Sequence, residues 1–243
     1  MEERFIRTAY IVGDDAVNKI RNSSVIIFGV GGVGSFCAEA LARLGVGRIT
    51  IVDNDIVAPS NINRQLLALH STIGRHKVDV MKERILDINP DCNVLAIKAF
   101  YLPENADEID LSHYDCIVDA IDTVSAKIEI CVRATQLGIP VISSMGTGNK
   151  LCPDMLEATD IYKTSVCPLA RVMRRELKAR GIKKLRVVYS KEEPLPRNSA
   201  YIGDGNSDKK VSPGSISFVP SSAGLLIAKE VMSVLIKEKE EKK

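Results

Sequence analysis

Short, unbroken apolar segments alternate along the chain with longer segments in which apolar residues recur at helical spacing. The short segments predict buried strands at residues 25–28, 49–52, 116–118, 141–144 and 185–189. The helical patterns cover residues 34–44, 73–88, 124–137, 169–180 and 222–237. Strands without polar positions are typical of sheets covered by helices on both faces. The alternation therefore predicts an α/β fold: a doubly wound, Rossmann-like, mostly parallel sheet with ligands at the carboxyl ends of its strands.

The length and the distribution of turn residues predict how this fold is organised. A chain of 243 residues suits one substantial core, so we expect a single domain over residues 1–243, with a nucleotide-binding core of about 1–150 and a C-terminal α/β elaboration of about 151–243. The stretch 192–214 is rich in Pro, Asn, Gly and Ser and predicts a mobile loop over the site. The segment 222–237 predicts a helix packed in the core, with membrane contact as the alternative. The charged run 237–243 extends or frays that helix.

A glycine-rich loop provides the first candidate chemistry. Gly29, Gly31 and Gly34 follow a predicted strand and open a predicted helix, so backbone N–H groups and the helix N-terminus can meet a phosphate. Asp53 ends the next strand, where a carboxylate can accept hydrogen bonds from a ribose. These features fit an ATP enzyme and a nicotinamide-dependent dehydrogenase equally well. A glycine turn without a ligand is the structural alternative.

Two cations and a carboxylate separate these alternatives. Arg64 and Lys77 add positive charge beyond what a dinucleotide needs, which suits a triphosphate that releases pyrophosphate. Asp122 follows the strand at 116–118, at the same carboxyl edge, where it can hold Mg²⁺. Each cation alone would be an ordinary surface charge. Combined with the glycine loop, they predict a site for ATP and Mg²⁺.

The distribution of charge along the chain bears on whether the protein binds nucleic acid. The net charge of +2 gives no general affinity for polyanions, but one cluster of cations surrounds the helix predicted at 169–180. This cluster is a candidate RNA-binding surface, with a plain solvated helix face as the alternative. Its members are Arg171, Arg174, Arg175, Lys178, Arg180, Lys183, Lys184 and Arg186.

The cysteines and the N-terminus indicate in which cellular compartment the protein works. None of the six cysteines forms a CxxC pair, which argues against a disulfide framework and a four-cysteine zinc site. The N-terminus is charged and lacks an apolar signal segment, and no uncharged run is long enough to span a bilayer. We therefore expect a cytoplasmic protein, with peripheral membrane contact as a minor alternative.

Several motifs within residues 4–150 together resemble the ubiquitin-activating-enzyme-like superfamily of ThiF-type adenylating enzymes. They are Arg4-Phe5-Ile6-Arg7, Gly29-x-Gly31-Gly32-x-Gly34, Asp53-x-Asp55, Ser60-Asn61-Ile62-Asn63-Arg64-Gln65, Gly74-x-x-Lys77, Asn89-Pro90 and Asp119-x-x-Asp122.

The resemblance implies a role for each matching position. Catalytic roles fall to Arg7, Arg64, Lys77 and Asp122, with Asp122 as the Mg²⁺ ligand. Arg7 would reach into the site of a partner subunit, which implies a homodimer. The implied ATP-binding residues are Gly29, Gly31, Gly32, Gly34, Asp53, Asp55, Ser60, Asn61, Asn63, Arg64, Gln65, Lys77, Asp122 and Thr123.

The missing CxxC pairs point to one branch of the superfamily. Sulfur-carrier activators usually hold zinc with two such pairs, whereas the branch of tRNA threonylcarbamoyladenosine dehydratases lacks them. The segments 45–47 and 213–221 also resemble that branch. It implies ATP-dependent cyclisation of the modified adenosine through an acyl adenylate, with tRNA as the partner. Cys167 is then a bystander thiol rather than a nucleophile.

Two other functions stay open on the sequence alone. One is activation of a small ubiquitin-like sulfur-carrier protein, in which case a carrier or a cysteine-desulfurase-type protein would be the partner. The other is a Rossmann binding module or an NAD-linked oxidoreductase that does not adenylate.

Overall fold

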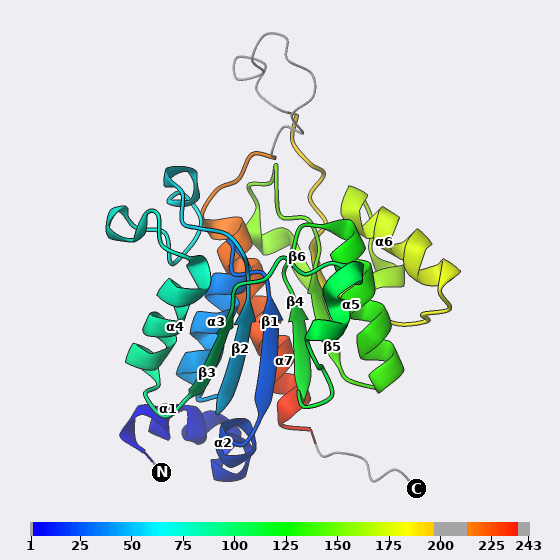
Figure 1. Ribbon diagram of the computed structural model, residues 1–243. Coiled ribbons are helices and arrows are strands. Elements are labelled where there is room, and N and C mark those ends of the chain that lie inside the picture. The colour runs from blue at the N-terminus through cyan, green and yellow to red at the C-terminus, as the bar shows by residue number, and fades with distance from the viewer. Residues whose placement is uncertain (1, 197–212, 238–243) are drawn as a thin grey trace, which may run out of the picture.

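A seven-stranded sheet forms the centre of the computed structural model, which describes residues 2–196 and 213–237 (Figure 1). The strand order is β3-β2-β1-β4-β5-β7-β6, and every neighbouring pair is parallel except β6 with β7. This confirms the predicted α/β, mostly parallel sheet. The strands are β1 (Ser24–Phe28), β2 (Arg48–Val52), β3 (Asn93–Ile97), β4 (Cys116–Asp119), β5 (Val141–Ser144), β6 (Leu156–Asp160) and β7 (Arg186–Ser190).

Helices cover both faces of this sheet. Buried side chains of α3, α4 and α7 pack with one face of β1 and β2, whereas those of α5 pack with the other face of β1, and α5 and α6 pack with β7. The short helices α1 and α2 lie at the end of the sheet where its strands begin (Figure 1). The helices are α1 (Glu3–Val12), α2 (Asp14–Arg21), α3 (Gly34–Leu44), α4 (Lys77–Ile88), α5 (Val124–Leu137), α6 (Pro168–Ala179) and α7 (Phe218–Leu235).

The predicted elements are found, but helices α1 and α2 were not predicted, α7 begins at Phe218 rather than at residue 222, and three further differences follow. The helix expected from residue 73 begins only at Lys77, because Gly74 has a φ of +84° and His76 forms a bridge with Ile56. Strands β3 and β6 were not predicted. Both lie at an edge of the sheet and are only partly buried, so they lack the unbroken apolar pattern of the central strands.

Helix α7 packs in the core, as predicted. It is long and apolar enough to cross a membrane, yet half of it is buried inside the protein. Val219, Ala223 and Ile227 are fully buried, and a Cβ at Gly224 would lie only 2.4 Å from the Val33 carbonyl oxygen. The helix therefore presses directly on the glycine-rich loop. The charged run after residue 237, and residues 197–212 of the predicted loop, lie outside the described residues.

Candidate functional site

A pocket of about 630 Å³ opens at the carboxyl ends of the parallel strands. Loops that follow β1, β2, β3, β4 and β5 line it, together with the start of α4 and the segment that leads into α7. Most of the predicted nucleotide-binding residues therefore lie in one place, although Gly34 does not line the pocket. The predicted residues that line the pocket are Gly29, Gly31, Gly32, Asp53, Asp55, Asn61, Arg64, Gln65, Lys77 and Asp122.

The glycine loop between β1 and α3 is shaped by close backbone contacts. Gly29 has a φ of +86°, and a Cβ there would lie 2.7 Å from the Ala120 carbonyl oxygen. A Cβ at Gly34 would lie 1.8 Å from the Gly29 carbonyl oxygen. At Gly31 the nearest atom would be 3.7 Å away, on the pocket side. Gly29 and Gly34 thus allow the loop to close on itself, whereas Gly31 leaves space for a ligand.

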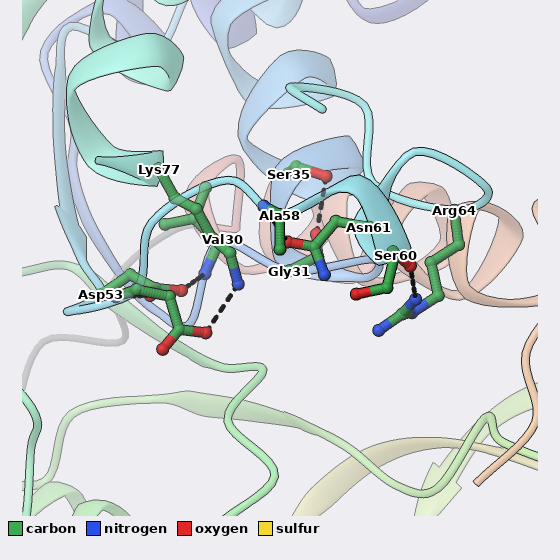
Figure 2. A network of polar contacts seen from close by, with 10 residues as sticks. Val30, Gly31, Ser35, Asp53, Ala58, Ser60, Asn61, Arg64 and Lys77 are labelled. Carbon is green, nitrogen blue, oxygen red and sulfur yellow. Dashed lines mark hydrogen bonds and ion pairs between the residues drawn. The ribbon is translucent and has the colours of Figure 1, made fainter. Parts of the chain in front are cut away.

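Asp53 fastens the glycine loop to the end of β2. One of its carboxylate oxygens accepts a hydrogen bond from the Val30 N–H at 2.7 Å (Figure 2). The other accepts one from the Asp55 N–H at 2.8 Å. Burial raises the pKa of Asp53, although these two bonds and nearby Lys77 act in the opposite direction. A carboxylate has about four acceptor positions. Asp53 therefore retains capacity for a ribose while it holds the loop.

Lys77 carries a buried positive charge at the pocket wall. Lys77 is only 4% exposed, and its Nζ lies 2.7 Å from Oδ2 of Asp55. Lys77 is also the first residue of α4, where the helix dipole disfavours a cation. A lysine at this position is thus costly for the helix, and Asp55 offsets that cost. The position suits a role in binding a polyanion.

The segment around η1 (Pro59–Asn61) holds Arg64 at the pocket rim. The Arg64 guanidinium donates a hydrogen bond to the Ser60 carbonyl oxygen at 2.9 Å (Figure 2). It donates another to Oδ1 of Asn63 at 3.0 Å. Ser60 and Asn63 do not themselves line the pocket. Asn61 caps the segment by accepting a hydrogen bond from the Ala58 N–H at 3.0 Å. Ser60 and Asn63 therefore orient the guanidinium, and Asn61 holds the segment that carries them.

Asp122 offers a free carboxylate opposite the glycine loop. It is exposed, lines the pocket, and has no hydrogen bond or ion pair within residues 2–196 and 213–237. Mg²⁺ in nucleotide sites usually takes one or two carboxylates together with phosphate oxygens. In the described part of the chain no group of three potential metal ligands occurs, and the Asp122 carboxylate has the chemistry of a single Mg²⁺ ligand. Thr123 is the N-cap of α5 and does not line the pocket.

Two residues singled out in the sequence do not line the pocket: Arg7 lies away from it, and Cys167 lies behind its wall at Gly146. Arg7 is exposed on α1, at the opposite end of the sheet, where Phe5 of the same helix packs against Gly45 (Figure 1). In its own chain it does not reach the pocket. Cys167 is 1% exposed at the start of α6 and does not line the pocket either.

The predicted RNA-binding cluster is smaller in the structure than in the sequence. Arg174 is half-buried and donates to the Thr164 carbonyl oxygen at 3.0 Å, so part of its hydrogen-bonding capacity is used within the chain. Arg175 and Arg180 form ion pairs with Glu176, and Arg186 forms one with Glu230. Among the described residues, the cations of this surface without a partner are Arg171, Lys178, Lys183 and Lys184, joined by Lys163 of η5 (Ile161–Lys163), which the sequence did not indicate.

The sequence also missed one wall of the pocket. Phe100 and Tyr101 follow β3, and residues 144–148 follow β5. Tyr101 is 4% exposed, and its ring centroid lies 4.7 Å from that of Phe28. Its hydroxyl oxygen accepts a hydrogen bond from Arg133 at 3.1 Å. The sequence could have indicated these residues by their position after a strand, because residues that follow a parallel strand lie at the edge of the sheet where ligands bind. Without β3, that signal was missing for Phe100 and Tyr101.

Comparison with known protein families and sequences gives consistent matches over the whole chain. The ThiF family model matches residues 3–243. The tRNA threonylcarbamoyladenosine dehydratase of Bacillus subtilis (strain 168) is 44% identical over 250 residues, covering 100% of this chain and 98% of the relative. The enzyme of the same name from Escherichia coli (strain K12) is 38% identical over 177 residues, covering 73% of this chain and 66% of the relative.

Solved structures agree with the sequence relatives. The E. coli tRNA N6-threonylcarbamoyladenosine dehydratase TcdA in complex with AMP superposes with a TM-score of 0.87 at 32% identity, covering 96% of this chain and 94% of that chain. Its complex with ATP gives a TM-score of 0.84 at 31% identity, with the same coverage.

Proposed function

The chain belongs to the ThiF family, and we propose that it is an ATP-dependent adenylating enzyme that cyclises threonylcarbamoyladenosine beside the anticodon of tRNA. The support is the full-length similarity to the B. subtilis tRNA threonylcarbamoyladenosine dehydratase and to the ATP and AMP complexes of E. coli TcdA. The membership agrees with the resemblance drawn from the motifs.

The first step joins the modified nucleoside to AMP. The free carboxylate of the threonylcarbamoyl group attacks the α-phosphate of ATP, forms an acyl adenylate and releases pyrophosphate. The backbone N–H groups of the loop at 29–34 and the N-terminus of α3 receive the phosphates. Arg64 and Lys77 stabilise the negative charge that grows on the leaving pyrophosphate. Asp53 holds the loop in place and accepts hydrogen bonds from the ribose.

The second step closes a ring. The urea group of the same substituent attacks the activated carbonyl carbon and displaces AMP, so that the nucleoside loses the elements of water. The nucleophile and the electrophile are tethered to one another, which supplies the proximity that an enzyme nucleophile would otherwise provide. No cysteine lines the described pocket, in agreement with an acceptor that belongs to the substrate. Residues 144–148 also line the pocket, and in this proposal they contact the substituent.

Asp122 would hold Mg²⁺ together with the phosphates of ATP. The metal would supply Lewis-acid polarisation of the phosphate that is attacked.

The observation that carries this proposal is the convergence of unlike elements on one pocket. Gly31 has no side chain at the pocket, Lys77 is a buried cation paired with Asp55, and Asp122 is a carboxylate without a partner in the described chain. A dehydrogenase would need no such set of charges around the phosphates. ATP with Mg²⁺ needs room for the phosphates, a cation beside them and a carboxylate for the metal.

The decisive experiment supplies the protein with ATP, Mg²⁺ and tRNA that carries threonylcarbamoyladenosine, followed by mass spectrometry of the nucleosides. We expect a product lighter by one water, and no product without ATP. ATP–pyrophosphate exchange that depends on a carrier protein ending in Gly-Gly, and not on modified tRNA, would contradict the proposal in favour of sulfur-carrier activation.

Three further points belong to the proposed function: the homodimer, the tRNA-binding surface and the compartment. The protein acts as a homodimer in which Arg7 enters the site of the partner, and the neighbouring Tyr10 and Ile11 are 81% and 86% exposed on α1. Large apolar side chains that are this exposed favour an interface. The unpaired cations around α6 bind the phosphate backbone of tRNA. The enzyme works in the cytoplasm, where its tRNA and ATP are available.

A further inference from the structure

A buried ion pair lies under the pocket and takes no part in the proposed chemistry. Asp119 ends β4, Lys127 lies in the second turn of α5, and both side chains are 0% exposed. Lys127 Nζ lies 2.9 Å from Oδ2 of Asp119, and Ser143 on β5 donates a hydrogen bond to the same oxygen. Burying two charges carries a large desolvation cost, and such pairs can often be replaced by apolar residues without loss of stability. Stability alone therefore explains this pair poorly.

The ion pair holds the loop that carries Asp122. Lys127 Nζ donates to the Ile121 carbonyl oxygen at 3.2 Å, and the Ile121 N–H donates to Oδ1 of Asp119 at 3.4 Å. Both backbone polar groups of Ile121 are thus engaged from below. The adjacent Ala120 donates its N–H to the Phe28 carbonyl oxygen at 2.8 Å, at the start of the glycine loop. Asp122 is the next residue after this fixed segment.

The pair also determines which carboxylate is free. Asp119 is the last residue of β4 and Asp122 follows it by three positions, but Asp119 is paired with Lys127 and accepts a hydrogen bond from Ser143. Asp122 has no such partner within residues 2–196 and 213–237. The arrangement leaves a single unpaired carboxylate from this strand facing the pocket.

We propose that Lys127, acting through Asp119 and the Ile121 peptide, is a positioning residue that sets the place of Asp122 relative to the phosphates of ATP. The proposal rests on the proposed function in one respect, the assignment of Asp122 to Mg²⁺. Partners behind a metal ligand orient it in the same way in other metal sites, and their loss typically costs about 10–100-fold in metal affinity.

The test uses the double variant Asp119→Asn/Lys127→Met in the full chain. It removes both charges together and keeps the side-chain bulk and the acceptor for Ile121 N–H, so it is expected to fold where Lys127→Met alone would leave a buried, unpaired carboxylate. Hydrogen exchange of the ligand-free protein is expected to be faster at residues 120–122 than in the wild type. The gain in ATP affinity on adding Mg²⁺, measured by calorimetry with and without EDTA, is expected to fall by about tenfold or more.

The control is Ser143→Ala, which removes a hydrogen bond to Asp119 but touches neither Ile121 nor the pocket. It should leave both measurements close to those of the wild type. Unchanged exchange at residues 120–122 in the double variant, or an equal effect of Ser143→Ala, would overturn the proposal. A wild-type protein that binds ATP but leaves modified tRNA unchanged would instead contradict the proposed function, and the exchange measurement would still decide the role of Lys127.

Discussion

Individual residues in the pocket do different work although they belong to one motif. Gly29 and Gly34 allow close backbone contacts, whereas Gly31 borders open space. Asp53 holds the loop, and Asp55 pairs with Lys77. A single sequence pattern therefore contains residues for folding and residues for binding, and only their surroundings distinguish them.

Substituting alanine at two of the glycines should separate these roles. Gly34→Ala places a methyl group 1.8 Å from the Gly29 carbonyl oxygen, so it should lower the free energy of unfolding by roughly 1–3 kcal/mol or more. Gly31→Ala meets no atom within 3.7 Å, so stability should be retained while the methyl group weakens ATP binding. Urea denaturation and calorimetry measure the two effects. Equal stability of the two variants would contradict this account of the loop.

Removing charge from the pocket should abolish turnover without unfolding the protein. Lys77→Met retains the packing of a side chain that is almost fully buried, and Asp122→Asn keeps the shape of an exposed one. Each should lower the rate of dehydration by about 10²-fold or more, because the charge that stabilises the phosphates or holds Mg²⁺ is lost. The mass-spectrometric assay under single-turnover conditions measures the rate. Normal activity in either variant, with an unchanged circular dichroism spectrum, would refute the assigned role.

At the scale of elements, the site depends on how helices are fixed to the sheet edge. Helix α3 begins in the glycine loop, α4 begins with Lys77, and α7 packs on the loop through Gly224. Glu39 on α3 links two of these helices, since it accepts hydrogen bonds from Arg84 on α4 at 2.6 Å and from Arg43 at 2.8 Å.

The link through Glu39 should make stability depend on pH. Burial by itself would raise the pKa of Glu39, but hydrogen bonds and charges of Arg84 and Arg43 outweigh it and hold the pKa below its ordinary value. A lowered pKa in the folded state stabilises the protein above the unfolded pKa, and this stability is lost as pH falls through the folded value. Glu39→Gln should therefore cost about 1.5–3 kcal/mol at pH 7. In urea denaturation the difference from the wild type should shrink toward acidic pH; a difference independent of pH would exclude the mechanism.

The free cations around α6 should matter for tRNA and not for ATP. Reversing charge at Lys178 and Lys183 should raise the KM for modified tRNA and reduce the salt dependence of binding by about one unit of slope per lost contact. The matched control is Arg175→Glu, which alters a cation already paired with Glu176. Steady-state kinetics at several salt concentrations measure the KM for modified tRNA and its salt dependence in each variant. Unchanged tRNA affinity in the double reversal would favour a plain solvated helix face.

The whole molecule determines where Arg7 can act. Within one chain, helix α1, which carries Arg7, lies at the end of the sheet where the strands begin (Figure 1), whereas the pocket lies at their carboxyl ends. A catalytic role is therefore possible only in an assembly, where α1 of one chain meets the pocket of another.

Mixing two inactive variants tests this arrangement. Arg7→Ala and Asp122→Asn should each be inactive, but in a heterodimer one site would combine the intact Asp122 of one chain with the intact Arg7 of the other. After exchange of subunits, about a quarter of wild-type activity should return. Light scattering must first show a dimer, which Tyr10→Glu should weaken. Retained activity in Arg7→Ala alone would remove this residue from the mechanism.

The sequence by itself determined the fold class, the central strands and most of the nucleotide-binding wall, because each of these leaves a local signal. Apolar runs marked β1, β2, β4 and β5, and the glycine spacing located the phosphate loop. The motifs also identified the family, which the comparisons confirm.

Tertiary structure decided what depends on pairing between distant segments. It brought Asp119, Lys127 and Ser143 together, engaged Arg174 in a hydrogen bond, and placed Phe100 at the pocket. It also placed Arg7 far from the pocket of its own chain. None of these leaves a periodic pattern, since a buried charge and a solvated one look alike in sequence. Only the packing of the surrounding side chains tells whether a charge is paired, buried or free to bind.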